Sequence, residues 1–491
     1  MPQATIELQL TTRSGTRFES LGEERFDLVE GLHRRGYLRA NCLLAPDQSR
    51  LWLKLLGGHI KLTYRDNTLY EGSISAAARR GPTVRVGSRP DFARDRSRAG
   101  QETSFLSPSA QPTPIHELRG FKQAYAAVAG LELLSARVTS LTKLGHCCEF
   151  DLLWRAAALS GMVLKSVAGR LEICAPTPSA TLAWPRDVVC SPQREWARIP
   201  SPHARCIAID QQGGELFDSG EQSPQADLPI ARELLEASQC AGAPLSSLDW
   251  LHEADRAVCQ STARQLAQAG LSRAYGCEIV VSDASMAPLQ QYAVPTGLGE
   301  TCNLVVGDRR VRFDPRKRVQ LRNRLSFVAA VAASLPPKSR RPGAAVRPGI
   351  VCETLDPTGR KCVRVWFPWM SGGGSGAQRE GMWCATDCKF AGLQPTPHYA
   401  GVGPLVGDWV EAVFSGAPEA LPYVRRAVPV GSGLSATDTD KYITLYDSPP
   451  LRVVIERTTG KVWWINTDDG RKATLCVRDG GVDFEGDLRF V

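Results

Sequence analysis

The stretch from Gly359 to Gly431 constrains the fold more than any other part of the chain. It opens with the sequence GRKCVRVWFPW, in which Val363, Val365 and Phe367 occupy alternate positions. A period of two is typical of a β-strand with one buried face. Three further β-type runs, separated by Gly and Pro, lie at Met382 to Thr386, Asp408 to Phe414 and Tyr423 to Val430. Four or five short strands within about seventy residues predict a small closed barrel of the OB type.

The motifs of this stretch resemble, in order and spacing, the VgrG-type spike proteins, which are relatives of the hub and spike of contractile phage tails. The matching segments are RVWFPW from Arg364 to Trp369, PLVGDWVEAVF from Pro404 to Phe414, and the segment from Gly416 to Tyr423. The sequence departs from the family pattern after Trp369 and in the loop after Gly416, where the usual acidic residues are missing. The resemblance implies a homotrimer in which this barrel lies at the base of a rigid stalk.

The composition is that of a soluble protein with several domains. The chain has 491 residues, 43% of them hydrophobic and 22% charged, with no apolar run near the roughly 20 residues that span a membrane. The first residues, MPQATIELQLTTRSG, have neither the basic nor the apolar region of a signal peptide. Because the 15 cysteines show no repeated spacing, we expect them to be mostly reduced and the protein to be made in the cytosol.

We predict a mainly β fold with a few helices, organised as multi-domain β-barrels, an OB-fold barrel and a C-terminal trimeric β-prism or β-helix stalk. Segments at Leu53 to Arg80, Glu149 to Gly161 and Arg322 to Ala330 resemble elements of the hub in the same family. The predicted domains are a first hub β-barrel at 1–87, a linker or insertion at 88–115, a second hub α+β barrel at 116–335, the OB-fold domain at 336–431 and the stalk at 432–491.

Helical periodicity and Gly stop signals predict two helices in the hub. The first runs from Glu149 to Gly161, and the second runs from Asp249 to Ala269 and ends before Gly270. Alternating or β-rich runs in the first hub domain predict strands at Ala4 to Leu10, Tyr37 to Leu44, Leu51 to Leu55, Ile60 to Tyr64 and Tyr70 to Ser75.

The last sixty or so residues read as short β segments that include the adjacent pair Trp463 and Trp464. Neighbouring residues in a strand point to opposite faces, so a small sheet covered on one side leaves one indole in water. A sheet of this size also buries too little surface to be stable alone. We therefore predict that three copies wrap together, with Trp366, Trp463 and Trp464 at the trimer interface. The short stalk implies a separate PAAR-like tip protein, contacted by Phe490 and Val491.

A run of cations around Asp314 is the strongest charge feature. One interpretation is a solvated hairpin face; the other is an anion-binding surface that docks on an acidic ring of the inner tube or contacts nucleic acid. The candidate docking residues are Arg309, Arg310, Arg312, Arg316, Lys317 and Arg318, with Arg322 and Arg324 nearby.

Tryptophans in the barrel leave a second function open. Trp366, Trp369, Trp383 and Trp409 could form a stacking platform for single-stranded nucleic acid, as OB folds often do. Two of them belong to the spike motif, which favours packing within or between subunits. The alternative to a spike is therefore an OB-fold protein that binds single-stranded nucleic acid.

The sequence contains no convincing catalytic, metal or cofactor motif. The vicinal Cys147 and Cys148 do not have zinc-ligand spacing, and the Gly-rich run from Gly372 to Gly376 lacks the Lys and Ser/Thr of a P-loop. We predict that the protein is not an enzyme and needs no metal or cofactor.

These observations predict a structural hub and spike of a contractile injection system, such as a phage tail, a tailocin, a type VI secretion apparatus or an extracellular injection particle. The implied partners are two further copies of the chain, the inner tube protein, baseplate proteins, the tip protein and an effector cargo, with a target membrane that is pierced mechanically. The resemblance implies assembly in the bacterial cytoplasm and delivery outward, in the particle, on contraction.

Overall fold

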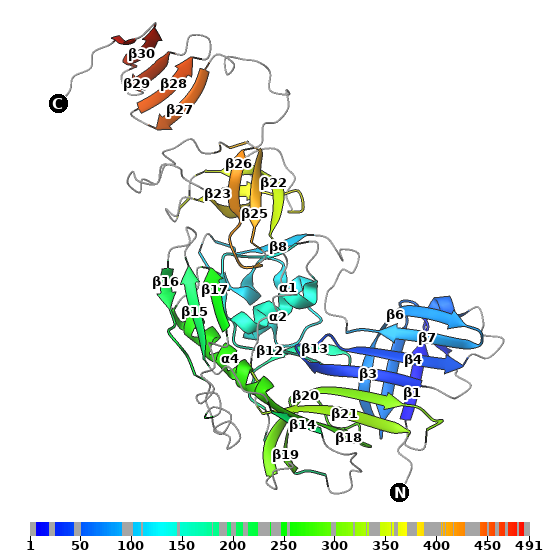
Figure 1. The fold of residues 1–491 in the computed structure, drawn as a ribbon. Coiled ribbons are helices and arrows are strands. Elements are labelled where there is room, and N and C mark those ends of the chain that lie inside the picture. The colour runs from blue at the N-terminus through cyan, green and yellow to red at the C-terminus, as the bar shows by residue number, and fades with distance from the viewer. Residues whose placement is uncertain are drawn as a thin grey trace. The chain divides into compact units, whose positions relative to one another are not determined.

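The computed structural model confirms the mainly β fold class. Helices α1 (Phe121–Ala124), α2 (Glu149–Leu159) and α4 (Arg256–Ala274) lie among many strands (Figure 1). No helix within the described ranges is long and apolar enough to cross a membrane. The structure describes residues 6–18, 25–43, 51–90, 102–109, 111–144, 148–178, 180–185, 194–197, 203–209, 215–223, 236, 247–252, 256–295, 301–317, 320–329, 331–332, 344–354, 356–357, 362–370, 381–386, 404, 406–407, 409–415, 417–427, 442–448, 451–456, 461–466, 470–478 and 481–485.

The chain forms two compact units. The first contains Met1–Gly100, Thr113–Val138 and Gly145–Arg341, and the second contains Gln101–Pro112, Thr139–Leu144 and Pro342–Val491. We call the first the hub unit and the second the barrel unit.

One large sheet is the framework of the hub unit, and its main path runs β14-β18-β21-β20-β3-β4-β7-β6-β5-β1-β2. The hairpin β12–β13 joins it through β3, and β19 joins it through β20. The strands of this sheet are β1 (Ile6–Thr11), β2 (Arg17–Phe18), β3 (Arg25–Leu32), β4 (Tyr37–Leu43), β5 (His59–Tyr64), β6 (Asn67–Arg80), β7 (Thr83–Ser88), β12 (Val163–Val167), β13 (Arg170–Cys174), β14 (Arg194–Ala197), β18 (Tyr275–Val281), β19 (Gln291–Pro295), β20 (Thr301–Phe313) and β21 (Leu321–Val328).

The long strand β6 folds the N-terminal part of this sheet over its own core. Its first half pairs with β5 and its second half with β7, with an irregularity between Ile74 and Ala76. In Figure 1, β1 runs across β3 and β4 as a result. Leu28, Leu38 and Ile60 are fully buried in the core between the two halves. The predicted strands at Tyr37, Ile60 and Tyr70 are confirmed.

The predicted strand at Leu51 to Leu55 is wrong, because these residues form a 3-10 helix (η2, Leu51–Leu55). Leu55 is fully buried and Trp52 packs against the same core, while Leu53 is exposed. The predicted boundary at residue 87 also cuts through one continuous sheet, because β20 pairs with β3 along six residues.

Helix α2 confirms the predicted helix at residue 149. Phe150 and the residues from Leu152 to Leu159 are buried, and Gly161 follows in the left-handed conformation with a φ of 77°. This is the geometry that favours glycine after a helix end.

Helix α4 differs from the helix predicted at Asp249 to Ala269. Residues Ser247–His252 form strand β17, which pairs in parallel with β15 (Ala204–Ile209), and β16 (Glu215–Asp218) completes this small sheet. The helix begins at Arg256 and passes through Gly270 to Ala274. Leu271 and Ala274 are buried in a core with β18 and β21, and this burial outweighs the weak helix preference of one glycine.

Part of the predicted linker at 88–115 is structured. Strand β8 (Thr103–Leu106) pairs with β11 (Ser140–Lys143) in the barrel unit, while β9 (Thr113–Pro114) pairs with β10 (Arg137–Val138) in the hub unit. Trp369 Nε1 donates a hydrogen bond of 3.1 Å to Ser104 Oγ, which fixes β8 against the barrel. Short 3-10 helices at Ile115–Glu117 and Leu131–Leu133 flank α1.

The predicted OB-type barrel is present as a closed five-stranded barrel with the order β22-β23-β24-β26-β25. The pair β24–β26 is parallel and the other pairs are antiparallel. Its interior contains Val363, Val365 and Phe367, the three residues whose alternation predicted it. Its strands are β22 (Ala345–Glu353), β23 (Cys362–Trp366), β24 (Met382–Thr386), β25 (Trp409–Phe414) and β26 (Tyr423–Ala427).

Gly349 makes room for the barrel core. A Cβ atom at this position would lie 2.4 Å from Val365 Cγ1 and 2.9 Å from Phe367 Cδ1. We expect Gly349→Ala to lower the stability of the barrel by about 1–3 kcal/mol, because added atoms strain a packed core. Faster hydrogen exchange of β22 and β23 amides measures this effect. Gly87→Ala is the control, since its Cβ would lie 3.6 Å from Ala76 Cβ. Equal protection in both variants would show that the barrel core tolerates the added methyl.

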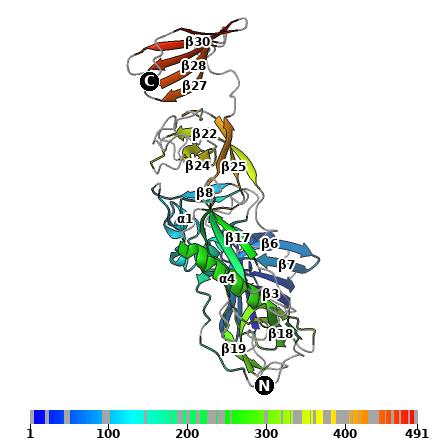
Figure 2. The same cartoon turned by 60° about the vertical axis from the view of Figure 1, so that its left-hand side comes forward.

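The C-terminal residues form a five-stranded antiparallel sheet in which each strand pairs with the next along the chain (Figure 2). These strands confirm the short β segments expected in the last sixty or so residues. They are β27 (Tyr442–Ser448), β28 (Leu451–Glu456), β29 (Val462–Asn466), β30 (Lys472–Arg478) and β31 (Gly481–Glu485).

Candidate functional site

The run of cations around Asp314 lies partly in the core and partly on the surface of the large sheet. Arg309 lies in the core and is not a surface docking residue, because its side chain is only 3% exposed. Its Nε donates a hydrogen bond of 2.7 Å to Glu30 Oε2, and its Nη1 donates to the carbonyl oxygens of Ala284 and Met286, each at 3.0 Å. Burial raises the pKa of Glu30, and the Arg309 charge opposes that rise. The prediction for Arg309 is therefore corrected: it is part of a buried ion pair between β3 and β20.

The neighbouring residues Arg310 and Arg312 point to the opposite, solvent-exposed side of β20, and both contact Asp27 on β3. Arg310 Nε donates to Asp27 Oδ1 at 2.7 Å, and Arg312 Nε lies 3.4 Å from the same oxygen. Burial acts to raise the pKa of Asp27, but the hydrogen bond and charge of Arg310, with the charge of Arg312, lower it. One carboxylate thus neutralises part of the charge of two arginines.

Strand register places arginines directly opposite one another on this exposed side. Arg310 faces Arg324, and Arg312 faces Arg322, across the β20–β21 pair. Arg324 forms an ion pair with Glu278 on the next strand, β18. Like charges directly opposite in a sheet are unfavourable, and the ion pairs with Asp27 and Glu278 offset part of this repulsion.

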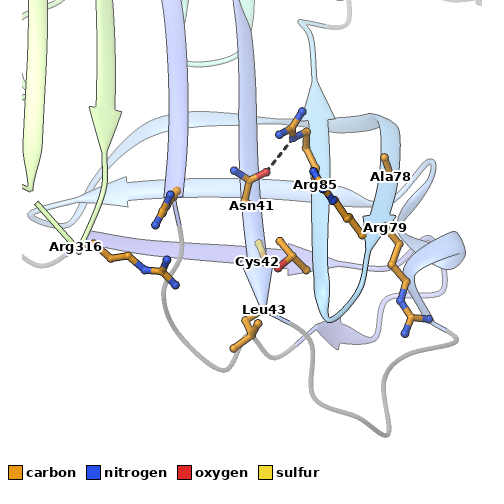
Figure 3. Close-up of a pocket in the computed structure, with 10 residues that line it drawn as sticks. Asn41, Cys42, Leu43, Ala78, Arg79, Arg85 and Arg316 are labelled. Carbon is orange, nitrogen blue, oxygen red and sulfur yellow. Dashed lines mark hydrogen bonds between the residues drawn. The ribbon is translucent and has the colours of Figure 1, made fainter.

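A cleft of about 430 Å³ opens at the end of the sheet where β4, the β6–β7 hairpin and the β20–β21 connection meet. Figure 3 shows Arg316 on one side of Asn41 and Arg79 and Arg85 on the other. Arg85 Nε donates to Asn41 Oδ1 at 3.1 Å. The residues that line this cleft are Arg25, Asn41, Cys42, Leu43, Ala78, Arg79, Arg80, Thr83, Arg85 and Arg316.

A second hollow of about 360 Å³ adjoins the first and shares Arg25, Asn41 and Arg85 with it. We call the two together the basic cleft. Its two carboxylates, Asp27 and Asp314, are already in ion pairs with arginines. Nine cations line the cleft: Arg25, Arg39, Arg79, Arg80, Arg85, Arg312, Arg316, Lys317 and Arg322.

Sequence reasoning found four of these cations and missed the five on the N-terminal strands. Arg25, Arg39, Arg79, Arg80 and Arg85 are scattered along the first 87 residues and form no run. Only the pairing of β3 with β20 brings them beside Arg312 and Arg322. The sequence signal for these cations was the alternation of apolar and polar residues within the strands, in which Arg39 and Arg85 occupy polar positions.

The tryptophans predicted at the trimer interface are half-buried within one chain. Trp366 lies in β23 opposite Ile350 of β22. Trp463 and Trp464 lie in β29, the central strand of the C-terminal sheet, opposite Thr474 and Ala473 of β30. The Lys472 ammonium lies 5.8 Å from the centre of the Trp463 ring. On each face of this single-layer sheet, one indole therefore remains partly exposed.

The remaining predicted positions lie outside the described residues: Arg318, Phe490 and Val491. The part of the chain that the structure describes contains no group of three or more His, Cys, Asp or Glu residues arranged to hold a metal ion.

No protein-family model matches the sequence, and no curated protein matches it. Solved structures do resemble the fold. A chain of the Francisella PdpA-VgrG complex in its lidded form aligns with a TM-score of 0.52 and 9% identity, covering 99% of this chain and 80% of that one. The half-lidded form of the same complex gives 0.52 and 9%, covering 98% and 87%. The E. coli c3393 protein, described as a type VI secretion component, gives 0.49 and 13%, covering 87% and 98%.

The fold of this chain resembles that of the chain in the Francisella PdpA-VgrG complex, which is the VgrG-like fold that the barrel motifs predicted. The likeness extends along nearly the whole chain and is not confined to the barrel.

Proposed function

We propose that the protein is the structural hub and spike of a contractile injection system. The observation that carries this proposal is the fold likeness to the Francisella PdpA-VgrG complex over 99% of the chain, with a TM-score of 0.52. The barrel motif of the sequence supports it independently, since its alternating residues form the barrel interior. The function is mechanical: a stiff assembly that passes the force of contraction to a membrane.

The working form that we propose is a homotrimer. The C-terminal sheet is a single layer of five short strands, with half-buried indoles on both sides of its central strand. Sheets of this size need further cover to be stable, and two identical neighbours would supply it on both faces. Trp366 on the barrel is a proposed part of the same interface.

The other partners follow from this role. We propose contacts with the inner tube protein and baseplate proteins, a PAAR-like tip protein at the end of the stalk, and an effector cargo. Arg312, Arg316 and Lys317 are the candidates for docking on the tube. We propose no catalytic activity, and assembly in the bacterial cytoplasm before delivery outward in the particle.

The alternative, single-stranded nucleic-acid binding by the barrel, is disfavoured by the packing of its tryptophans. The Trp369 ring stacks on Phe367 with a centroid distance of 4.8 Å, and the Arg364 guanidinium lies 5.9 Å from the centre of the Trp383 ring. Both indoles are thus already in contact with protein side chains. Binding of an oligothymidylate that disappears in Trp383→Ala and Trp409→Ala would favour the alternative.

Electron microscopy of the purified protein tests the proposed function. We expect class averages of elongated particles with threefold symmetry about the long axis, because three stalk sheets must wrap around one another. Compact particles of one chain, or averages with twofold symmetry, would contradict the proposal.

A further inference from the structure

The half of the basic cleft at the β6–β7 hairpin concentrates positive charge without a carboxylate among the described residues that line it. Arg25, Arg79, Arg80, Arg85 and Arg316 surround a volume of about 430 Å³. They come from β3, the β6–β7 hairpin and the β20–β21 connection, and the last of these lies more than 200 residues after the other two in the chain. The fold therefore brings them together, and no local run of sequence does so.

The neighbouring carboxylates offset only part of this charge. Asp314 forms an ion pair of 3.2 Å with Arg25, and Asp27 is bound by Arg310 and Arg312. Arg85 has a neutral partner, the amide oxygen of Asn41. Guanidinium groups that line one cleft repel one another, so the cleft is favourable for an anion that enters it.

The chemistry of the lining indicates which anion. All five cations are arginines, whose planar fork binds carboxylate or phosphate through two parallel hydrogen bonds. A phosphate group carries about −1.5 to −2 charges and three acceptor oxygens, whereas a carboxylate carries one charge. Two or three phosphates thus match five guanidinium groups, whereas five carboxylates with their carbon chains need much more room.

The uncharged residues that line the cleft limit the class of ligand further. Among the described residues these are Asn41, Cys42, Leu43, Ala78 and Thr83, and none of them has an aromatic ring against which a nucleobase or sugar could stack. Recognition is therefore of charge and phosphate geometry. We propose that this half of the basic cleft binds a ligand with two or three clustered phosphate groups, such as an oligophosphate or a polyphosphorylated headgroup. The inference does not rest on the proposed spike function.

Tripolyphosphate is the probe for the first test. Isothermal titration of the full chain should show binding that weakens as salt is raised, since screening reduces the attraction. The variant Arg80→Gln/Arg85→Gln should bind at least about tenfold more weakly, because each lost charge-assisted hydrogen bond reduces affinity by that order. The control Arg137→Gln/Arg170→Gln removes the same charge from exposed positions outside the cleft and should bind as the wild type does.

Thermal unfolding separates a binding role from a structural role. Without ligand, Arg80→Gln/Arg85→Gln should have a Tm equal to or above that of the wild type, because repelling charges are removed. Tripolyphosphate should raise the Tm of the wild type and of the control, and not that of the cleft variant. A cleft variant whose Tm falls by several degrees without ligand would overturn the proposal in favour of a structural role.

Two further probes identify the source of the phosphates and the rival ligand. Vesicles of phosphatidylcholine, with and without phosphatidylinositol bisphosphate, test for a lipid headgroup. Binding only to the vesicles that contain phosphatidylinositol bisphosphate assigns the site to a lipid. Binding of tripolyphosphate without binding to either vesicle assigns the site to a free ligand. An octaglutamate peptide tests for an acidic protein segment. The proposal is overturned by equal affinity for octaglutamate and tripolyphosphate, by equal weakening in the control, or by no binding of any phosphate probe at millimolar concentration.

Discussion

Replacing the paired indoles of the C-terminal sheet, Trp463→Ser together with Trp464→Ser, should convert the proposed trimer into monomers of 53.4 kDa. Burying a tryptophan contributes about 1.5–3 kcal/mol or more, and three chains lose six such side chains at once. Because both residues lie in the central strand β29, their loss weakens both faces of the C-terminal sheet. Sedimentation equilibrium measures the change in mass.

The hub should remain folded in this variant, since its core is made of other residues. Trp463→Phe together with Trp464→Phe is the matched control, because it keeps most of the apolar area and should keep the trimer. If the serine variant has the same mass as the wild type, the C-terminal sheet does not hold the chains together. If the hub unfolds as well, the loss of mass reports general instability and not a specific interface.

Arg309→Met should destabilise the hub unit by about 3–5 kcal/mol, the usual effect of removing one partner of a buried ion pair. The Glu30 carboxylate would stay fully buried in the sheet without its guanidinium. Hydrogen exchange of β3 and β20 amides in the full chain reports the loss locally. Arg310→Met is the control: its pair with Asp27 is partly exposed, so the expected loss is within about 1 kcal/mol.

The destabilisation in Arg309→Met should also depend on pH. Burial raises the pKa of Glu30, so the folded state binds a proton more tightly than the unfolded state. The folding stability that comes from this tighter proton binding is fully present below the ordinary glutamate pKa. It is lost as the pH rises through the pKa of Glu30 in the folded state. Removing Arg309 raises this pKa further, so the deficit relative to wild type should be smallest in acid and largest above neutrality. A deficit that is independent of pH would show that Glu30 is not the affected group.

The barrel was predictable because its signal is local. The alternation around Val365 and the Gly and Pro punctuation lie within the segment that folds, and the strand at Met382 was predicted to the residue. Strand β22 was missed, since Ala345 to Pro348 belongs to a Pro- and Arg-rich stretch that resembles a linker. Backbone pairing with β25 makes this stretch a strand, although its composition is typical of a linker.

The hub was less predictable because its decisive contacts join distant segments. Strand β3 was missed, since Asp27, Glu30 and Gly31 interrupt its apolar pattern. Glu30 is buried there as the partner of Arg309, which is 279 residues away in the chain. The same pairing explains why Arg309 was wrongly placed on the surface, and why the N-terminal half of the basic cleft gave no signal in the sequence.

The solution mass of the intact protein tests the central claim most directly. Three chains of 53.4 kDa predict about 160 kDa by sedimentation equilibrium or multi-angle light scattering, unchanged over a wide range of protein concentration. A stable species at 53.4 kDa, with the C-terminal sheet protected from hydrogen exchange, would show that one chain alone satisfies its indoles and would contradict the trimeric spike.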